Sequence, residues 1–316
     1  MGNLSSGRVR KTSSQRGPRD VAATSPAGVP AMARHLSSTP APRMAQSRAT
    51  PACARLPVMI CDARRFQSTV PFYARYRLMY PPRLIERVIA HTGLRGGDPV
   101  LDLGTGPGLL AVPFAAAGMR VTAADPEPAM LQAAGERARA AGVTLTLWSG
   151  GSGDLTSDMG PYRLVTMGRS FHWMDRAATL DLLDRIIAPD GAIALFHDEH
   201  PRTAENHWRE TLHAVADRFG RRSDPAVLER NSPGYRSHAS YLLASRFNVL
   251  EGVSVVIRKP ITLDEIVGRA LSMSTCSPEK LGERIGDFET ELRSALAGGS
   301  DFSEIASLVA LIARRP

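Results

Sequence analysis

The stretch VLDLGTGPG, residues 100–108, decides the fold of this chain. A short apolar run, as expected of a buried strand, leads into three glycines at alternate positions, Gly104, Gly106 and Gly108. Glycine lets the backbone turn sharply and lets a ligand approach without a Cβ atom in the way. The spacing G-x-G-x-G differs from the dinucleotide pattern G-x-G-x-x-G and from the phosphate loop G-x-x-x-x-G-K-[ST]. We therefore expect a strand, a loop and a helix that hold a ligand against the loop backbone.

An acid stands at the place where such a unit needs one. Asp125 follows Gly108 by 17 residues and ends a second apolar run, MRVTAAD (119–125). In an open α/β sheet, an acid at this strand end can accept hydrogen bonds from two ribose hydroxyls. Taken separately, the glycines only make a turn and Asp125 only caps the next helix. Together, they predict a nucleoside site.

Helical and apolar segments alternate along the rest of the chain. Segments with the pattern of strands are 143–148, 164–168, 192–197, 253–259 and 304–315, and segments with the pattern of helices are 81–93, 107–118, 126–142, 175–191, 262–273 and 277–296. Alternation with short connections predicts an α/β chain with a parallel sheet that is covered on both faces. Residues 203–250 are mostly helical and polar in pattern, and we expect them to form a lid over the site.

The positive charge of the chain lies in its first 65 residues. Residues 1–65 hold 11 of the 39 Lys and Arg and two of the 31 Asp and Glu, which leaves 28 basic and 29 acidic residues for the remainder. A domain that binds nucleic acid should itself be basic, so nucleic acid is not the expected partner.

The same leader has no apolar period of a strand or a helix. Its Ser, Ala, Pro and Arg cannot bury enough surface to offset chain entropy, so we expect residues 1–65 to be disordered. Alternatively, translation starts further on, at Met32, Met44 or Met59. A transit peptide is a third reading, which the dominance of Arg over Lys, typical of a GC-rich bacterial genome, disfavours.

Cysteine usage and hydropathy give no sign of a metal, a disulfide or a membrane. Cys53, Cys61 and Cys276 lack the spacing of a metal site or of a disulfide framework. No apolar run approaches the length of a membrane span. A protein of the reducing cytoplasm, without a metal, is expected.

Over residues 66–316 the sequence resembles the class I S-adenosylmethionine-dependent methyltransferases. The resemblance rests on VLDLGTGPG, on AADPEPAML (123–131) and on GGSGDL (150–155). It implies a Rossmann-like fold with a mostly parallel seven-stranded sheet, helices on both faces and a helical lid insertion near 203–250. S-adenosylmethionine is the implied cofactor.

Three further motifs resemble a small-molecule branch of this class. FHWMD (171–175) is similar to its F-H-W-[FM]-D signature, YARYRLMYPP (73–82) to its entry segment, and SMSTCSPEKLG (272–282) to its late S-x-S-x-x-S-P pattern. The three motifs occur in the order of the branch, so a small-molecule substrate is implied.

The resemblance assigns parts of the cofactor to particular residues. The glycines pass close to the methionine portion, and Asp125 binds the ribose. Pro126 and Met130 flank the adenine, with Asp154 and Leu155 on its other side. The implied cofactor-binding residues are Tyr73, Arg77, Gly104, Thr105, Gly106, Gly108, Asp125, Pro126, Met130, Asp154, Leu155, Arg169 and Ser170.

Three of these assignments carry a specific expectation. Tyr73 and Arg77 are expected to hold the amino-acid carboxylate of the cofactor, because a guanidinium fork suits a carboxylate. Core packing is the alternative for Tyr73, Tyr76 and Tyr80. Arg169 and Ser170 are expected to touch the cofactor through backbone groups.

The stretch RSFHWMD (169–175) follows the fourth strand and so faces the reacting methyl group. His172 has an ordinary pKa of about 6.5, which suits a general base. The alternative is that His172 only walls and orients the substrate, because methyl transfer can work by positioning alone. Trp173 can stack on the substrate or line the sulfonium.

The acids after the fifth strand suggest what is methylated. FHDEHPRTAEN (196–206) carries a dense polar group, which is either a solvated loop or a site for ammonium and hydroxyl groups. We expect a cationic or polyhydroxylated small molecule, best an amino sugar methylated on nitrogen in an aminoglycoside-type antibiotic pathway. The expected substrate-binding residues are Trp173, Tyr76, His197, Asp198 and Glu199.

Other functions stay open at this point. The acceptor could be the oxygen or carbon of a carboxylic acid, a polyketide or a phenol. An RNA methyltransferase is disfavoured, because RSFHW replaces the N/D-P-P-Y/F loop of amino-methylating enzymes. A non-enzymatic binding protein would not need an intact glycine loop, and a nucleotide-dependent oxidoreductase has different glycine spacing.

Overall fold

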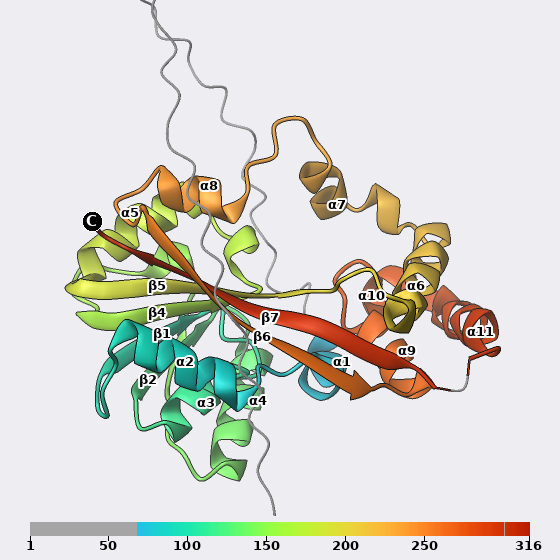
Figure 1. The fold of residues 1–316 in the computed structure, drawn as a ribbon, viewed down its shortest axis with the longest axis horizontal. Helices are drawn as coiled ribbons and strands as arrows, with labels where there is room; N and C mark the ends of the chain where they lie inside the picture. The colour runs from blue at the N-terminus through green and yellow to red at the C-terminus, as the bar shows by residue number, and fades with distance from the viewer. Residues whose placement is uncertain (1–67, 300) are drawn as a thin grey trace, which may run out of the picture. The chain divides into compact units, whose positions relative to one another are not determined.

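The computed structural model describes residues 68–299 and 301–316, apart from the side chains of residues 225 and 226 (Figure 1). The predicted leader, with Cys53 and Cys61, lies outside these residues. The described part contains a seven-stranded sheet of order β3-β2-β1-β4-β5-β7-β6. Its strands are β1 (Pro99–Leu103), β2 (Arg120–Asp125), β3 (Thr146–Ser149), β4 (Tyr162–Gly168), β5 (Ile187–Glu199), β6 (Val249–Pro260) and β7 (Ser303–Arg314).

Strands β1 to β5 run parallel, and β7 enters antiparallel between β5 and β6. The strand order reverses beside β1, since the chain builds outward to β3 and then returns to β4 on the other side. Ligands of open α/β sheets bind at the carboxyl ends of the strands at such a switch point. The glycine loop after β1 and residues 169–175 after β4 therefore flank one crevice, and the predicted fold class is confirmed.

The helices occupy the connections that the alternating pattern predicted. They are α1 (Val70–Tyr76), α2 (Pro82–Thr92), α3 (Ala111–Ala116), α4 (Pro128–Ala140), α5 (Arg176–Ile186), α6 (His207–Arg218), α7 (Pro225–Arg230), α8 (His238–Leu243), α9 (Leu263–Leu271), α10 (Pro278–Leu281) and α11 (Ile285–Leu296). In Figure 1, α2 and α3 lie on one side of the sheet and α5 and α8 on the other.

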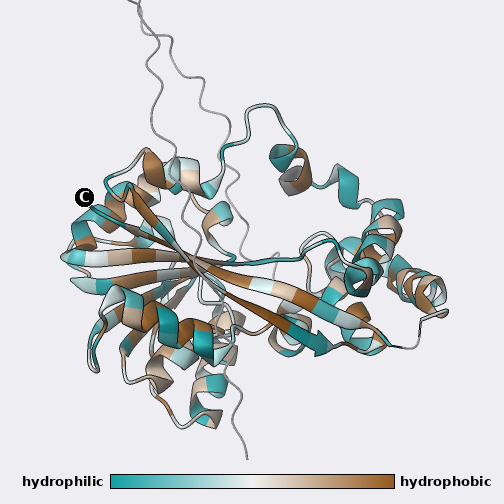
Figure 2. Ribbon diagram, in the orientation of Figure 1, coloured by the Kyte–Doolittle hydropathy of each residue, from teal (hydrophilic) through white to brown (hydrophobic). Residues whose placement is uncertain are grey.

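Successive residues of the central strands pack into two different cores. In β1, Val100 joins the core under α2 and α3, and Leu101 joins the core under α5. In β4, Leu164 and Val165 divide in the same way. Because both faces are buried, these strands are mostly apolar, and Figure 2 shows brown stretches along the strands of the sheet.

A third core lies beyond the end of β5. The pairing of β5 with β7 stops at Glu199, whereas β6 and β7 stay paired as far as Pro260 and Ser303. The helices α6, α9, α10 and α11 pack together there around buried side chains that include Trp208 and Phe288. We call these four helices the helical cluster; Figure 1 shows β6 and β7 reaching toward it.

The segment predicted as a lid, 203–250, divides between two cores. Trp208 and Leu212 place α6 in the helical cluster, whereas Leu242 packs α8 against the core under α5. In the helical cluster, α6 packs against α11, which lies far from it in the sequence. That residues of this segment cover the site stays a prediction.

Across residues 68–299 and 301–316, no helix combines the length and the apolar content that crossing a bilayer requires. Cys276 is buried in the helical cluster, and burial raises its pKa to about 11. A thiol with this pKa is protonated at neutral pH and packs as a small apolar side chain.

The packing of the helical cluster predicts a large effect for Phe288→Ala. Phe288 is fully buried and meets Phe219 edge-to-face, with 5.3 Å between the ring centroids. We expect truncation to lower the free energy of unfolding by about 3–5 kcal/mol, measured by urea denaturation. The control Val256→Ala removes a side chain that is 67% exposed, and should change it by less than about 0.5 kcal/mol. A loss below about 1 kcal/mol for Phe288→Ala would contradict this account of the cluster.

Candidate functional site

The glycine loop has no room for side chains at its first turn. Gly104, Gly106 and Gly108 have φ angles of +71°, +53° and +78°, in the left-handed region that favours glycine. A Cβ atom on Gly104 would lie 2.5 Å from the Cβ of Ser170. The hydroxyl of Ser170 donates to the carbonyl of Leu103 at 2.8 Å, so the loop after β4 closes directly onto the end of β1.

Asp125 ends β2 beside this loop. Its Oδ2 accepts from the backbone N–H of Gly106 at 2.8 Å, and its Oδ1 accepts from the N–H of Glu127 at 3.0 Å. Burial raises the pKa of Asp125, and the N–H donors of Glu127 and Gly106 oppose that rise. A carboxylate has about four acceptor positions, so each oxygen keeps one for a ligand.

Asp102, which the sequence analysis did not single out, fixes the glycine loop through hydrogen bonds. This carboxylate is 1% exposed and accepts from the hydroxyls of Thr105 at 2.6 Å and Thr166 at 2.7 Å and from the N–H of Ala111 at 3.1 Å. Burial raises the pKa of Asp102 to about 6, although these three donors oppose the rise. The signal was present in the sequence, because Asp102 is the one acid in the apolar run VLDL.

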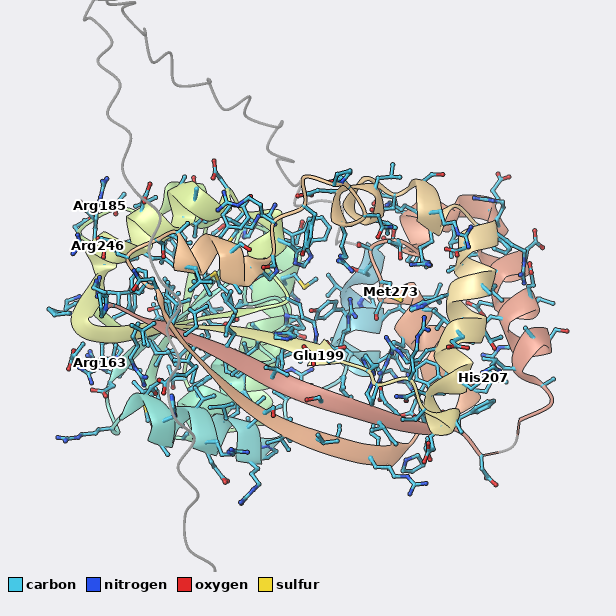
Figure 3. The ribbon with its side chains drawn as sticks, turned by 45° about the horizontal axis from the view of Figure 1, so that its top comes forward. Arg163, Arg185, Glu199, His207, Arg246 and Met273 are labelled. Carbon is cyan, nitrogen blue, oxygen red and sulfur yellow. The ribbon has the colours of Figure 1, made fainter. Side chains whose placement is uncertain are left out.

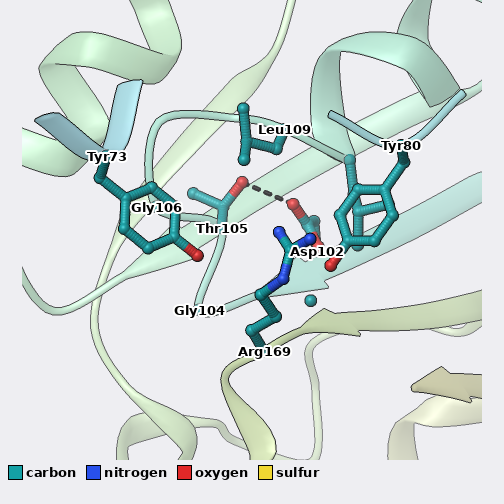
Figure 4. A pocket seen from close by; sticks show the side chains of 10 residues that line it. Tyr73, Tyr80, Asp102, Gly104, Thr105, Gly106, Leu109 and Arg169 are labelled. Carbon is teal, nitrogen blue, oxygen red and sulfur yellow. Dashed lines mark hydrogen bonds between the residues drawn. The ribbon is translucent and has the colours of Figure 1, made fainter. Parts of the chain in front are cut away.

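A cavity lies between the glycine loop and the end of β4, and Figure 4 shows it from close by. Five predicted cofactor residues line it: Tyr73, Gly104, Thr105, Gly106 and Arg169. The other lining residues, which the sequence analysis did not assign to the cofactor, are Tyr80, Asp102, Leu109, Leu110 and Gly168.

Arg169 brings its side chain, not only its backbone, to this cavity. Its φ of +56° is in the left-handed region, which is uncommon for a residue with a Cβ atom. The guanidinium lies 4.7 Å from the centre of the Tyr80 ring, donates through Nε to Asp198, and donates through Nη2 to the carbonyl of Leu78 at 3.1 Å. Its Nη1 is buried and has no partner.

Of the residues predicted for the adenine, Met130 lies beside the glycine loop and Pro126 lies beside Gly151. The position of a Cβ on Gly106 is 3.9 Å from the sulfur of Met130, and that of a Cβ on Gly151 is 4.0 Å from Pro126. Asp154 accepts from the N–H of Gly151 at 2.8 Å and is exposed, so one of its oxygens is already engaged in its own turn. Leu155 is buried, at 4% exposure. Their role toward a ligand stays a prediction.

His172 and Trp173 form the rim after β4, with their ring centroids 4.5 Å apart. His238 of α8 stacks on His172 at 6.2 Å, and its buried Nδ1 has no partner. Burial, and after it the charges of His238, Arg230, Arg176 and Arg77, together lower the pKa of His172 to about 3. The imidazole is therefore neutral across the physiological range, which favours an orienting wall over a strong proton acceptor.

The polar residues His197, Asp198 and Glu199, which were expected after the fifth strand, are the last residues of β5, and with His200 they are engaged with one another. His200 Nε2 lies 2.7 Å from Asp198 Oδ2, and Asp198 also pairs with Arg169. Although burial raises the pKa of Asp198, Arg169, His200 and Arg77 bring it well below its usual value. His197 Nε2 lies 3.2 Å from Glu199 Oε1, and the Glu199 side chain is 66% exposed.

Tyr76 does not join the other predicted substrate residues. Its ring packs where a Cβ on Gly268 of α9 would be, 2.3 Å away, and it lines a separate groove with Phe72 and Arg75. Tyr73, which lies three residues earlier in α1, lines the cavity at the glycine loop instead. No group of His, Cys, Asp and Glu suited to a metal ion occurs among the described residues.

Comparison with known proteins gives a family for the central part of the chain. A family described as "Methyltransferase domain" matches residues 100–191. An uncharacterized methyltransferase of Mycobacterium bovis is 30% identical over 171 residues, which are 53% of this chain and 65% of that protein. An uncharacterized methyltransferase of Mycobacterium tuberculosis matches to the same extent.

Solved structures with a similar chain path include two methyltransferases. One is a putative type II methyltransferase from Anaeromyxobacter dehalogenans, with a TM-score of 0.49 and 20% identity over 76% of this chain and 98% of that one. The other is a methyltransferase from Thiobacillus denitrificans in complex with S-adenosyl-L-homocysteine, with a TM-score of 0.48 and 21% identity over 79% of this chain and 98% of that one.

The strand order, the glycine loop and the family match agree. Residues 100–191 include the loop, Asp125 and the rim at His172, which are the parts that form the crevice. This region of the chain is a methyltransferase domain of the class I family, whose methyl donor is S-adenosylmethionine.

Proposed function

We propose that this protein transfers a methyl group from S-adenosylmethionine to a nitrogen or oxygen atom of a small molecule. One observation carries the proposal above the others. The carboxylate of Asp125 is fixed at the switch point by the N–H groups of Gly106 and Glu127, with acceptor positions left for a ligand. This is the arrangement that a ribose with two neighbouring hydroxyls requires.

The described residues fit the other parts of the cofactor as well. Gly106 has no side chain, so an adenosyl group can approach its backbone on the side that faces Met130. The unpartnered Nη1 of Arg169 suits the carboxylate of the amino-acid portion, because a guanidinium binds a carboxylate in a fixed geometry. Tyr73 lines the same cavity and completes its wall.

When bound, the cofactor would supply an electrophilic methyl group on a sulfonium. A lone pair of the acceptor would form the new bond to the methyl carbon, and the electron pair of the carbon–sulfur bond would stay on sulfur. The protein's contribution is to hold the acceptor in line with that bond. His172 and Trp173 wall the acceptor side, and the neutral ring of His172 can accept a hydrogen bond from it. An amine or hydroxyl acceptor loses its proton to solvent or to His172.

The acceptor is proposed to be a metabolite and not a nucleic acid. Beyond residue 65 the charges of the basic and acidic residues nearly cancel, so the composition does not predict a positively charged surface that would bind phosphates. The amino sugar expected from the sequence has weaker support in the structure, because Asp198 is already paired with Arg169 and His200.

Substitution of the first glycine tests the loop. Gly104→Ala puts a Cβ atom 2.5 Å from the Cβ of Ser170 at a φ of +71°, so the loop must shift. We expect affinity for S-adenosylhomocysteine, measured by calorimetry, to fall by at least about tenfold, or about 1.4 kcal/mol.

Gly142→Ala is the matched control. Gly142 has a similar φ of +67°, but no atom lies within 4 Å of its Cβ position, and it lies after α4, away from the crevice. It should lose stability through backbone strain while keeping its affinity for S-adenosylhomocysteine. Equal affinity of Gly104→Ala and wild type would contradict the proposed site.

The lowered pKa of His172 predicts a pH effect on stability. The unfolded chain binds a proton on this ring below pH 6.5, whereas the folded chain, with a pKa of about 3, does not. The contribution of the neutral His172 ring to the stability of the folded state is therefore present above pH 6.5 and is lost as the pH falls toward 3. His172→Asn should lose less stability than wild type between about pH 6.5 and 4.5, in urea denaturation at each pH. Identical pH dependence of the two proteins would rule out this environment for His172.

A further inference from the structure

The guanidinium of Arg169 is held on three sides. Its Nε donates to Oδ1 of Asp198, its Nη2 donates to the carbonyl of Leu78 at 3.1 Å, and its face lies 4.7 Å from the centre of the Tyr80 ring. The Arg169 side chain is only 10% exposed. Because the N–H groups of a guanidinium lie in one rigid plane, these contacts together fix the direction of the remaining nitrogen, Nη1.

Nη1 is the part of this guanidinium that is left for a ligand. It is buried and has no hydrogen-bond partner among the described residues. Arg169 lines the cavity at the glycine loop together with Tyr73 and Gly106, and Figure 4 shows its guanidinium pointing toward that loop between the rings of Tyr73 and Tyr80. A buried donor without an acceptor is unfavourable, so a ligand that brings an acceptor to Nη1 gains a hydrogen bond.

Asp198, which holds Nε, is itself fixed by a second side chain. Its Oδ2 lies 2.7 Å from Nε2 of His200, whose side chain is 8% exposed. Both carboxylate oxygens are therefore engaged by the protein, one by Arg169 and one by His200. The described residues that line the cavity include Arg169 but not Asp198. Asp198 can therefore act on a ligand of this cavity through Arg169.

We propose that Asp198 is a positioning residue, which holds the guanidinium of Arg169 so that Nη1 meets the carboxylate of the amino-acid portion of the methyl donor. The inference rests on the proposed methyl transfer and gives Asp198 a role toward the donor. The sequence analysis expected Asp198 to bind the methyl acceptor instead. The two roles differ in which ligand loses affinity when Asp198 is replaced.

Two ligands that differ in the amino-acid portion test the proposal. S-adenosylhomocysteine carries this portion, whereas 5′-methylthioadenosine has the adenosine and thioether groups without it. Asp198→Ala should weaken binding of S-adenosylhomocysteine by at least about tenfold and change the affinity for 5′-methylthioadenosine by less than about twofold, both measured by calorimetry. Asp198→Asn keeps an acceptor for Nε but not the charge, so it should show a smaller loss, again for S-adenosylhomocysteine alone.

Asp184→Ala is the matched control, because it also removes an acid that accepts from an arginine Nε. Asp184 accepts from Nε of Arg315 at 2.8 Å and is 27% exposed, and it precedes the start of β5, whereas Asp198 lies near the end of that strand. Figure 3 shows Arg246, which also pairs with Asp184, on the left of the view and away from Glu199. Asp184→Ala should leave the affinities for both ligands unchanged.

A double substitution shows whether Asp198 acts through Arg169. Arg169→Met removes Nη1 and should itself weaken binding of S-adenosylhomocysteine by at least about tenfold. When Asp198→Ala is added to Arg169→Met, the affinity should change by less than about twofold, because the group that Asp198 positions is already absent. A further tenfold loss in the double variant would show that Asp198 acts independently of Arg169, and the proposal would be wrong.

The other outcomes also have distinct meanings. If Asp198→Ala keeps the wild-type affinity for S-adenosylhomocysteine, Asp198 positions nothing for the donor and the proposal is wrong. If Asp198→Ala and Asp198→Asn weaken binding of both ligands equally, Asp198 supports the fold of the whole crevice and the proposal is also wrong. If wild type binds neither ligand, the proposed function fails, whatever the role of Asp198.

Discussion

The crevice depends on one buried carboxylate. Asp102 accepts hydrogen bonds from the hydroxyls of Thr105 and Thr166 and from the N–H of Ala111, and so joins β1 to the glycine loop, to β4 and to the start of α3. Burial disfavours its ionised form, as the pKa of about 6 shows, and the three donors offset part of that effect. The loop is thereby held in its left-handed turns before any ligand arrives, which reduces the entropy that binding must overcome.

The sheet could be predicted from the sequence because its determinants are local. Buried parallel strands are continuous apolar runs, and VLDLG and VTAAD end at residues whose chemistry marks the carboxyl edge of the sheet. The helical cluster could not be predicted in this way. It depends on β6 and β7 staying paired beyond Glu199, and on α6 meeting α9 and α11, and no local pattern records either relation.

The candidate site shows the same division. The loop glycines and Asp125 follow from motif and strand order, and the N–H of Gly106 donates to Asp125 in the structure. That His172 faces the same crevice stays a prediction. The side-chain position of Arg169 follows from a left-handed φ that a single sequence does not reveal. Its neighbours in the sequence made Asp198 a candidate to bind a cationic ligand. In the structure its charge is balanced by Arg169, which lies 29 residues away in the sequence.

The extension of β6 and β7 past the rest of the sheet has an evolutionary consequence. The proposed site of the methyl donor lies at the loops after β1 and β2, whereas α6 and its neighbours lie beside β6 and β7 at the opposite edge of the sheet. Residues of α6 can therefore change without disturbing the glycine turns. In related proteins with this fold, sequence changes in the helical cluster can alter acceptor specificity while the glycine loop and Asp125 stay unchanged.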